Sequence, residues 1–322
     1  MKTLPALLNL IYISMFIVFT LVLMGCDNSE NPKQIDMSLR SSHSPLLATT
    51  HRLPDMEPHY HFAFNLRSSP QEDAKQYISF LNYLEKATGY HFELSLTSKD
   101  QQIDQQLGLG LVHFAAIGAV THVRAQQHYS VTSLARGLNS HNMAEYQSVV
   151  VVKPDSPIEN LEQLKGKRLA FGNVESTQGH LIPRIELLEK GINLQDFSEY
   201  TYTGSHQDCA NTVITGKYDA CAMQDTMGNS LVQQGLVKII HRSSYYPSSG
   251  ISANKDVPPE VIDVVRQALL DFKPNGEHAE GLYEWGETEM PNGFTSANDD
   301  DYIQLKKWMI RLGMLDKTGV DK

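Results

Sequence analysis

Apolar and polar positions alternate over residues 60–66, a period of two that predicts a strand with one buried face. Over 71–88 the apolar residues recur at helical spacing, and Gly89 follows as a stop signal. The first half of the chain therefore begins as a strand, a turn and a helix. The same two periods predict four further elements before residue 140: strands at 91–96, 114–117 and 130–135, and a helix at 100–107.

The second half of the chain repeats this interleaving. Consecutive valines within residues 148–153 predict a strand buried on both faces, and Pro154 ends it. Strands interleaved with helices predict largely parallel sheets, and the length fits two α/β lobes of roughly 100 residues or more each. The further strands expected are 168–171, 200–202, 219–223 and 238–241, and the helices are 179–190, 205–215, 226–234, 259–272 and 299–312.

The N-terminus carries one charge, Lys2, and then an apolar run that ends in Leu23-Met24-Gly25-Cys26. Such a run is typical of an export signal, although about twenty apolar residues also suffice for a transmembrane anchor. The Leu-x-Gly-Cys ending resembles the lipobox of bacterial lipoproteins, in which the signal is cut off and the cysteine is lipidated. We expect a signal over 1–25 and a lipid-anchored Cys26 on the periplasmic side of the membrane.

Residues 26–58 are polar, rich in proline and without a sustained period, so they are expected to form a tether. Four histidines, His43, His51, His59 and His61, raise a metal hypothesis, because imidazole is a common zinc ligand. Their irregular spacing and the lack of a nearby cysteine favour solvated linker histidines instead. No metal or cofactor is expected.

The composition limits the classes of function. With 41% hydrophobic residues and 20% charged residues in 322, the chain can bury a substantial core, which excludes a disordered protein. Its 27 Lys and Arg against 37 Asp and Glu give a formal net charge of −10. Nucleic-acid binding depends on excess basic residues, so no nucleic-acid partner is expected.

The strongest chemical signal lies between a predicted strand and a predicted helix, where Ser176 and Thr177 precede Gly179. The first turn of a helix offers unpaired N–H groups and the positive end of the helix dipole, and hydroxyl groups add donors that suit a tetrahedral oxyanion. The two residues are equally ordinary N-caps. No Gly-Lys-Ser/Thr follows, which excludes a Walker loop.

The segment Ser-Thr-x-Gly-x-Leu-x-Pro over 176–183, followed by Gly204-Ser205-His206, resembles the phosphate/phosphite/phosphonate-binding subunits of ABC importers. Four other stretches extend the resemblance, at 85–89, 149–157, 161–171 and 216–220. The resemblance implies a type II periplasmic binding protein, with two α/β lobes joined by two crossovers around a hinge cleft. It places lobe 1 at 59–147, lobe 2 at 148–240, and the return to lobe 1 at 241–322.

The resemblance also assigns contacts to a small anionic ligand. Ser176, Thr177 and Gly179 would donate to its oxygens, with the amide of Gln178 beside them. His206 would contribute an imidazole N–H, with a capping-turn histidine as the alternative. Asp225 would accept from a P–OH or an amine of the ligand, with a surface carboxylate as the alternative.

Two departures from the family pattern change the expected pocket. The chain has Ala115-Ala116-Ile117-Gly118 where family members often have an aromatic residue, and Gln178 where they have a second serine. The contacts from lobe 1 would then come from Arg67, Ser68 and Ser69, or from Asp100 and Gln101.

Cys209 and Cys221 remain after lipidation of Cys26. An exported protein permits a disulfide between them, and two buried thiols are the alternative. A zinc site formed with His206 is disfavoured, because it lacks a fourth ligand.

These features predict a lipid-anchored binding protein that delivers a small phosphorus oxyanion to an ABC permease. The alternatives are a sensory module that signals to a membrane kinase or cyclase, and a periplasmic phosphatase. The sequence contains neither Gly-x-Ser-x-Gly nor His-Glu-x-x-His, so no catalysis is expected.

Overall fold

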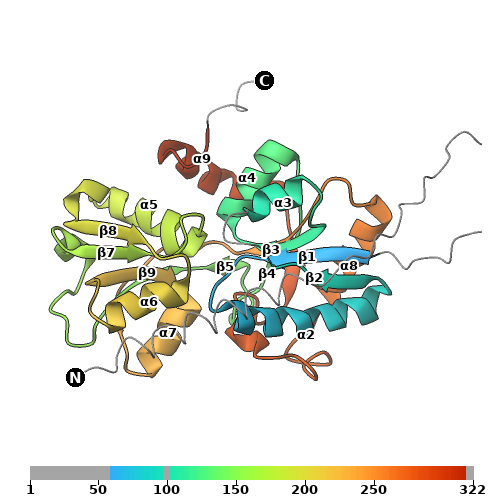
Figure 1. The fold of residues 1–322 in the computed structure, drawn as a ribbon, viewed down its shortest axis with the longest axis horizontal. Coiled ribbons are helices and arrows are strands. Elements are labelled where there is room, and N and C mark those ends of the chain that lie inside the picture. Colours follow the sequence, from blue (N-terminus) through green and yellow to red (C-terminus); the bar gives the residue numbers. More distant parts are fainter. Residues whose placement is uncertain (1–58, 97–101, 317–322) are drawn as a thin grey trace, which may run out of the picture. The chain divides into compact units, whose positions relative to one another are not determined.

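A computed structural model describes residues 59–96 and 102–316 (Figure 1). The chain divides into two units, 1–53 and 54–322, and the described residues belong to the second. The predicted signal, the tether, Cys26, Asp100 and Gln101 lie outside the described residues. Within the described part of the chain, no helix has both the length and the apolar character needed to cross a bilayer.

The first sheet has six strands in the order β13-β4-β12-β3-β1-β2. Helices α2 and α8 cover one face and α3 and α4 cover the other, as Figure 1 shows for α2, α3 and α4 about β1. The helix α2 begins where Ser69 accepts a hydrogen bond from Glu72 N, and it ends at Gly89, whose φ of 73° is left-handed. The elements are β1 (His59–Phe64), α2 (Pro70–Thr88), β2 (His91–Leu94), α3 (Ile103–Gly108), β3 (Phe114–Ile117), α4 (Ala119–Tyr129), β4 (Thr132–Gly137), β12 (Gly250–Ala253), α8 (Pro259–Asp271) and β13 (Phe294–Ser296).

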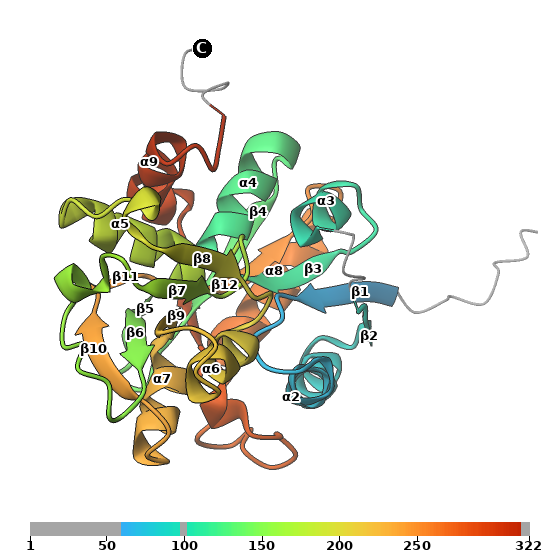
Figure 2. The same cartoon turned by 60° about the vertical axis from the view of Figure 1, so that its left-hand side comes forward.

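The second sheet has five strands in the order β10-β6-β9-β7-β8. Figure 2 shows α5 on one side of it and α6 and α7 on the other. The valines of β6 alternate between these two sides and are all buried, which confirms the expectation of a strand covered on both faces. The elements are β6 (Ser148–Val152), β7 (Arg168–Phe171), a π-helix (Thr177–Leu181), α5 (Ile182–Glu189), β8 (Glu199–Tyr202), α6 (His206–Ile214), β9 (Ala220–Gln224), α7 (Asp225–Gln233) and β10 (Lys238–Arg242).

Two crossovers connect the sheets and pair with each other. The strand β5 (Glu145–Tyr146) leads into the second sheet, β11 (Tyr246–Pro247) leads back, and they run antiparallel with Tyr146 opposite Tyr246. The C-terminal helix α9 (Ile303–Arg311) packs against α4 and against Leu181 and Ile185 of the second lobe. Short 3-10 helices complete the fold, at Leu161–Leu164, Leu194–Asp196, Trp285–Glu287 and Asp299–Tyr302.

The expectation of largely parallel sheets was wrong. Among the strands of the described residues, parallel pairing is confined to β1 with β2 and β3, and to β7 with β8 and β9. The strands that enter or leave through the crossovers, including β6 and β12, pair antiparallel with their neighbours, because the chain arrives from the other sheet. Helix α4 was not predicted, since its apolar residues gather at its first turns and its second half is polar.

A disulfide joins Cys209 in α6 to Cys221 in β9, with 5.7 Å between their Cα atoms. The structure thus decides between the disulfide and the two thiols left open by the sequence. Both cysteines are fully buried between α6 and the second sheet.

Replacing both cysteines (Cys209→Ala with Cys221→Ala) is expected to lower the free energy of unfolding by about 2–4 kcal/mol, because the short loop they close is released in the unfolded chain. Urea denaturation of the oxidised proteins measures this difference. Adding a reductant should destabilise the original protein and leave the variant unchanged. Equal stability of the two oxidised proteins would contradict the prediction.

Candidate functional site

A cavity lies between the two sheets, at the ends of β1, β3 and β7 and beside the crossovers. The volume of this cavity, counted as the space that the centres of water-sized spheres can occupy, is about 50 Å³. One water needs about 10–15 Å³ by this measure, so the cavity takes a group of a few heavy atoms, the size of a tetrahedral oxyanion. Its lining residues are Asn65, Leu66, Arg67, Gly118, Tyr146, Asn173, Glu175, Ser176, Thr177, Gln178, His206, Ser249 and Glu289.

Ser176 and Thr177 line this cavity at the start of a π-helical turn. The Ser176 hydroxyl accepts a hydrogen bond from Gly179 N at 2.8 Å, and Leu181 N reaches back to Ser176 O at 3.0 Å. Ser176 is thus an N-cap, as its residue type predicts, and borders the cavity as well. A hydroxyl that accepts one bond keeps its own proton to donate.

The Thr177 hydroxyl connects the two lobes. Its oxygen accepts a hydrogen bond from Val120 N, in the first turn of α4, at 3.0 Å. Gly118 lies directly opposite, where a Cβ would come within 3.0 Å of the Thr177 hydroxyl oxygen. An ion pair between Arg124 of α4 and Glu175 joins the same two segments. The predicted anion-binding turn therefore faces the N-terminal end of a helix from the other lobe.

Gln178 lines the cavity, but its side-chain amide is engaged elsewhere. Its Nε2 donates to Gln147 O at 2.8 Å and to the Asp225 carboxylate at 3.2 Å. Asp225 also accepts from the backbone N–H groups of Thr226 and Gln147, and burial raises its pKa. Asp225 is not among the lining residues, so its expected contact with the ligand stays a prediction without support from this geometry.

Gly179 is placed differently from the expectation. Its N–H bonds to the Ser176 hydroxyl, and the residue is not among those that line the cavity. A Cβ at this position would lie 2.9 Å from Cε1 of His206 and 3.0 Å from the Ser176 hydroxyl oxygen. The glycine therefore leaves room for the imidazole, and its N–H is already bonded within the protein.

The variant Gly179→Ala is expected to displace the His206 ring and to weaken binding of the predicted anion by roughly 5-fold to 150-fold, because the 2.9 Å contact forces a shift that costs on the order of 1–3 kcal/mol. Gly172→Ala is the matched control, since a Cβ there stays 3.4 Å or more from the same ring. Calorimetric titration of both variants measures the difference. Equal affinities would show that the ring position does not matter for binding.

His206 opens α6 and lines the cavity with a side chain that is almost fully buried. Ser205 caps the helix by accepting from Asp208 N at 3.0 Å. The Nδ1 of His206 is buried beside Gly172 and Gly179 and makes no hydrogen bond to the described residues. Burial lowers the pKa of His206 to about 4, so the protein groups alone keep the ring neutral at neutral pH.

Arg67 and Glu289 form a buried ion pair at the cavity, with 2.8 Å between Nη2 and Oε2. Arg67 Nη1 also donates to the Tyr77 hydroxyl at 2.6 Å. Burial raises the pKa of Glu289, but the charge of Arg67 and its hydrogen bond outweigh this and hold the pKa below its usual value. Arg67 thus lines the cavity with its charge already balanced, and its expected contact with the ligand stays a prediction.

The other residues expected from lobe 1 have structural roles. Ser68 is outside the cavity lining, and its backbone N–H donates to Asp73. Ser69 is the N-cap of α2. The lining contains six polar side chains that the sequence did not indicate: Asn65, Tyr146, Asn173, Glu175, Ser249 and Glu289. The Tyr146 hydroxyl is buried near Thr177 and Ser249, and burial raises its pKa.

The sequence profile of the ABC transporter phosphonate periplasmic substrate-binding proteins matches residues 62–302. This range includes every residue of the cavity lining. The chain belongs to this family. Members of the family are substrate-binding proteins of transporters, and nothing in these matches favours the sensory alternative or an enzyme.

Individual relatives support the same membership. The phosphate-import protein PhnD of Mycolicibacterium smegmatis is 26% identical over 267 residues, which cover 76% of this chain and 81% of that protein. A probable ABC transporter phosphite-binding protein of Prochlorococcus marinus is 31% identical, but over about half of each chain, 50% and 52%.

Solved structures show the same fold. PhnD1 of Prochlorococcus marinus in complex with methylphosphonate superposes with a TM-score of 0.72 at 16% identity, covering 80% of this chain and 99% of the other. A phosphonate-transporter binding protein of Pseudomonas aeruginosa gives a TM-score of 0.70 at 18% identity, covering 79% and 86%. The fold is that of the type II periplasmic binding proteins, as the resemblance implied.

Proposed function

We propose that this substrate-binding protein captures a small phosphorus oxyanion, namely phosphate, phosphite or a small phosphonate, and delivers it to an ABC permease. The observation that carries the proposal is the cavity, whose small volume is bordered by two hydroxyl groups at a helix start and by a buried imidazole. The names of the relatives point to the same ligand class, since they include phosphate, phosphite and methylphosphonate.

Recognition would rest on local donors, because the one cation among the described lining residues, Arg67, is paired with Glu289. The hydroxyls of Ser176 and Thr177 would each donate one hydrogen bond to an oxyanion oxygen, and a ring N–H of His206 would donate another. The helix dipole at the start of the π-helical turn favours the same negative charge.

Glu289 would select the protonation state of the ligand. Its carboxylate borders the cavity and is ionised beside Arg67, so it disfavours a dianion and can accept from a P–OH group. A singly charged oxyanion that keeps one proton therefore fits the lining better than the fully ionised form.

Isothermal titration of the purified protein with phosphate, phosphite and methylphosphonate tests the proposal. We expect saturable binding of at least one of them at one site per chain. Sulfate, which lacks a proton at neutral pH, is the control and should bind more weakly. The absence of heat with all three phosphorus ligands would exclude the stated ligand class.

The affinity is expected to rise as the pH falls, through His206. A bound anion stabilises the imidazolium and raises the pKa of His206 above about 4, so binding takes up a proton. The affinity of the original protein relative to His206→Asn should grow between about pH 8 and about pH 5, by at most tenfold per pH unit. The ligand's own change of protonation affects both proteins equally, so it cancels in this ratio. A ratio independent of pH would show that the ring stays neutral in the complex.

We further propose that Cys26 carries the lipid that anchors the protein on the periplasmic side of the membrane. The lipobox-like ending of the apolar N-terminal run supports this. Mass spectrometry of the protein isolated from membranes should give a mass that begins at Cys26 and includes acyl chains on that residue. A mass that retains residues 1–25 and carries no acyl chain would indicate an uncleaved N-terminal anchor instead.

A further inference from the structure

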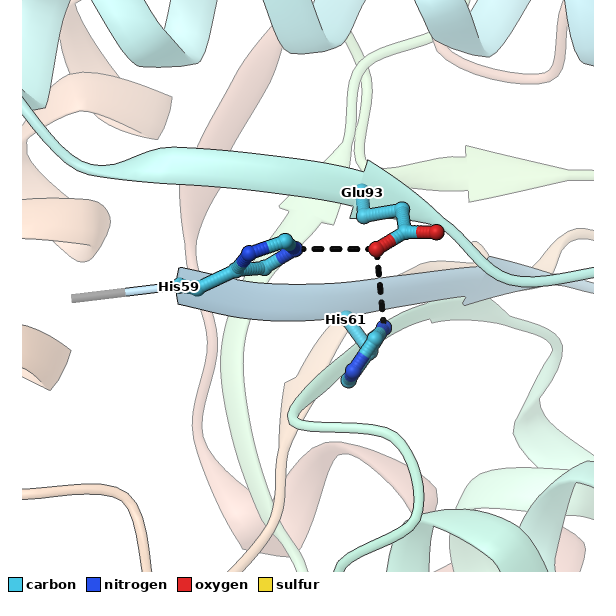
Figure 3. Close-up of side chains that lie close together, drawn as sticks. All are labelled: His59, His61 and Glu93. Carbon is cyan, nitrogen blue, oxygen red and sulfur yellow. Dashed lines mark ion pairs between the residues drawn. The ribbon is translucent and has the colours of Figure 1, made fainter. Parts of the chain in front are cut away.

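Two histidines and a glutamate converge on one side of the first sheet, away from the cavity (Figure 3). The His59 Nε2 lies 3.0 Å from a carboxylate oxygen of Glu93, and the His61 Nδ1 lies 3.9 Å from the same oxygen. One nitrogen or oxygen from each side chain lies within 4.8 Å of the others. The three side chains are 39%, 41% and 57% exposed, so an ion from solution can reach them.

Strand pairing explains why these side chains meet. His59 and His61 are two residues apart on β1 and therefore point to the same face. The strand β2 runs parallel beside it, with His91 opposite His59 and Glu93 opposite His61. The two histidines were expected in a solvated linker, but the structure places both on a strand, where the backbone fixes their spacing.

Neighbouring groups hold His61 in place. The backbone N–H of His61 donates to Nδ1 of His113 at 2.9 Å, and the two rings stack with 5.6 Å between their centres. His91 is engaged with Glu85 at 2.6 Å, so it is not counted among the ligands. The cluster therefore consists of two imidazoles and one carboxylate on a fixed backbone.

We propose that His59, His61 and Glu93 bind a divalent transition-metal ion, with zinc as the best match. Imidazole nitrogens and a carboxylate oxygen are zinc ligands at about 2.0–2.2 Å, and two imidazoles with one carboxylate form a known ligand set that leaves a position open to water. Two ligand atoms at this range are about 3.3–3.6 Å apart in a tetrahedral site. The observed 3.0 and 3.9 Å lie on either side of that range, so small rotations of exposed side chains suffice.

The site is separate from the oxyanion cavity. It lies at the beginning of β1, whereas the cavity residues Asn65 to Arg67 follow the end of the same strand. Six residues of strand span about 20 Å. The metal is therefore expected to affect neither the donors of the cavity nor the affinity for a phosphorus oxyanion, and the proposal does not depend on the function proposed above.

Titration of the full chain with zinc chloride, followed by competition with a chromophoric chelator, tests the site. We expect saturable binding of one ion by the original protein and loss of that binding in His59→Ala with His61→Ala. The single variant Glu93→Gln should weaken zinc binding by at least about tenfold. Losing a residue that merely hydrogen-bonds to a metal ligand already costs about tenfold or more, and Glu93 would be a ligand itself. The matched control is His128→Ala with His141→Ala, which removes two exposed histidines outside the cluster and should bind as the original does.

A second readout guards against a folding defect. An ion that binds only the folded state raises the unfolding temperature, so zinc should stabilise the original and control proteins and not the His59/His61 variant. The His59/His61 variant should have nearly the same unfolding temperature as the metal-free original protein, and it should still bind the same phosphorus oxyanion. Equal zinc affinity in all proteins would show that His59, His61 and Glu93 only form ion pairs. Loss of zinc binding in the control variant would also contradict the proposed site.

Discussion

Replacing Arg67 by methionine is expected to lower the free energy of unfolding by about 3–5 kcal/mol at neutral pH, because it leaves the buried carboxylate of Glu289 without its counter-charge. The Tyr77 hydroxyl loses its donor in the same change. Without Arg67, burial alone would raise the pKa of Glu289. The deficit should therefore shrink as the pH falls toward the usual glutamate pKa of about 4.3 and the carboxyl takes up a proton. Urea denaturation at several pH values measures both effects.

Two further variants separate the buried pair from a general effect of losing an arginine. Arg168 pairs with Asp219, but their side chains are 38% and 30% exposed. Arg168→Met is therefore expected to lower the stability far less than Arg67→Met does. Adding Glu289→Gln to Arg67→Met should recover most of the lost stability, since the uncompensated charge disappears. If the double variant is no more stable than Arg67→Met, the charge of Glu289 is not the cause.

The combined change of Ser176→Ala and Thr177→Val is expected to weaken oxyanion binding by roughly 30-fold to 10⁴-fold. Each lost hydrogen bond to a charged oxygen costs about 1–3 kcal/mol, and every 1.4 kcal/mol is tenfold in affinity. Thr177→Val also removes the acceptor for Val120 N, which weakens the contact between the lobes. Calorimetric titration with the best ligand of the original protein gives the ratio of affinities.

The matched control for this variant is Ser69→Ala, which removes another serine N-cap, that of α2, away from the cavity lining. A lost cap costs about 1 kcal/mol of stability, so both Ser→Ala changes should destabilise the protein by a similar amount. Only the change at Ser176 and Thr177 should reduce affinity. An unchanged affinity would mean that these hydroxyls serve only as a cap and as a contact between the lobes.

The parts of the fold and site that were predictable depend on local sequence. The strand at β1, the helix α2 with its Gly89 stop, and the buried β6 follow from periodicity and end signals within a few residues. The turn at Ser176 and Thr177 is local in the same way. Its placement on the cavity follows from the family resemblance and the fold.

The parts that were missed depend on contacts between distant segments. Glu289 is 222 residues from Arg67, and no motif around it indicates a partner. Tyr146 reaches the cavity from a two-residue crossover strand, too short to have a period of its own. Gly179 was expected to act through its N–H. In the structure, its lack of a side chain leaves room for the ring of His206, which belongs to a different element, α6. Such relations exist only in the folded chain.

The buried pair of Arg67 and Glu289 also affects how fast a ligand arrives. Two opposite charges 2.8 Å apart act on a distant ion almost as a dipole, and salt screens fields beyond about 8 Å at physiological ionic strength. The net charge of −10 on the chain gives an approaching oxyanion no attraction. The net charge is therefore not expected to speed association, and the time that the oxyanion stays among its hydrogen-bond donors contributes most to how tightly it is held.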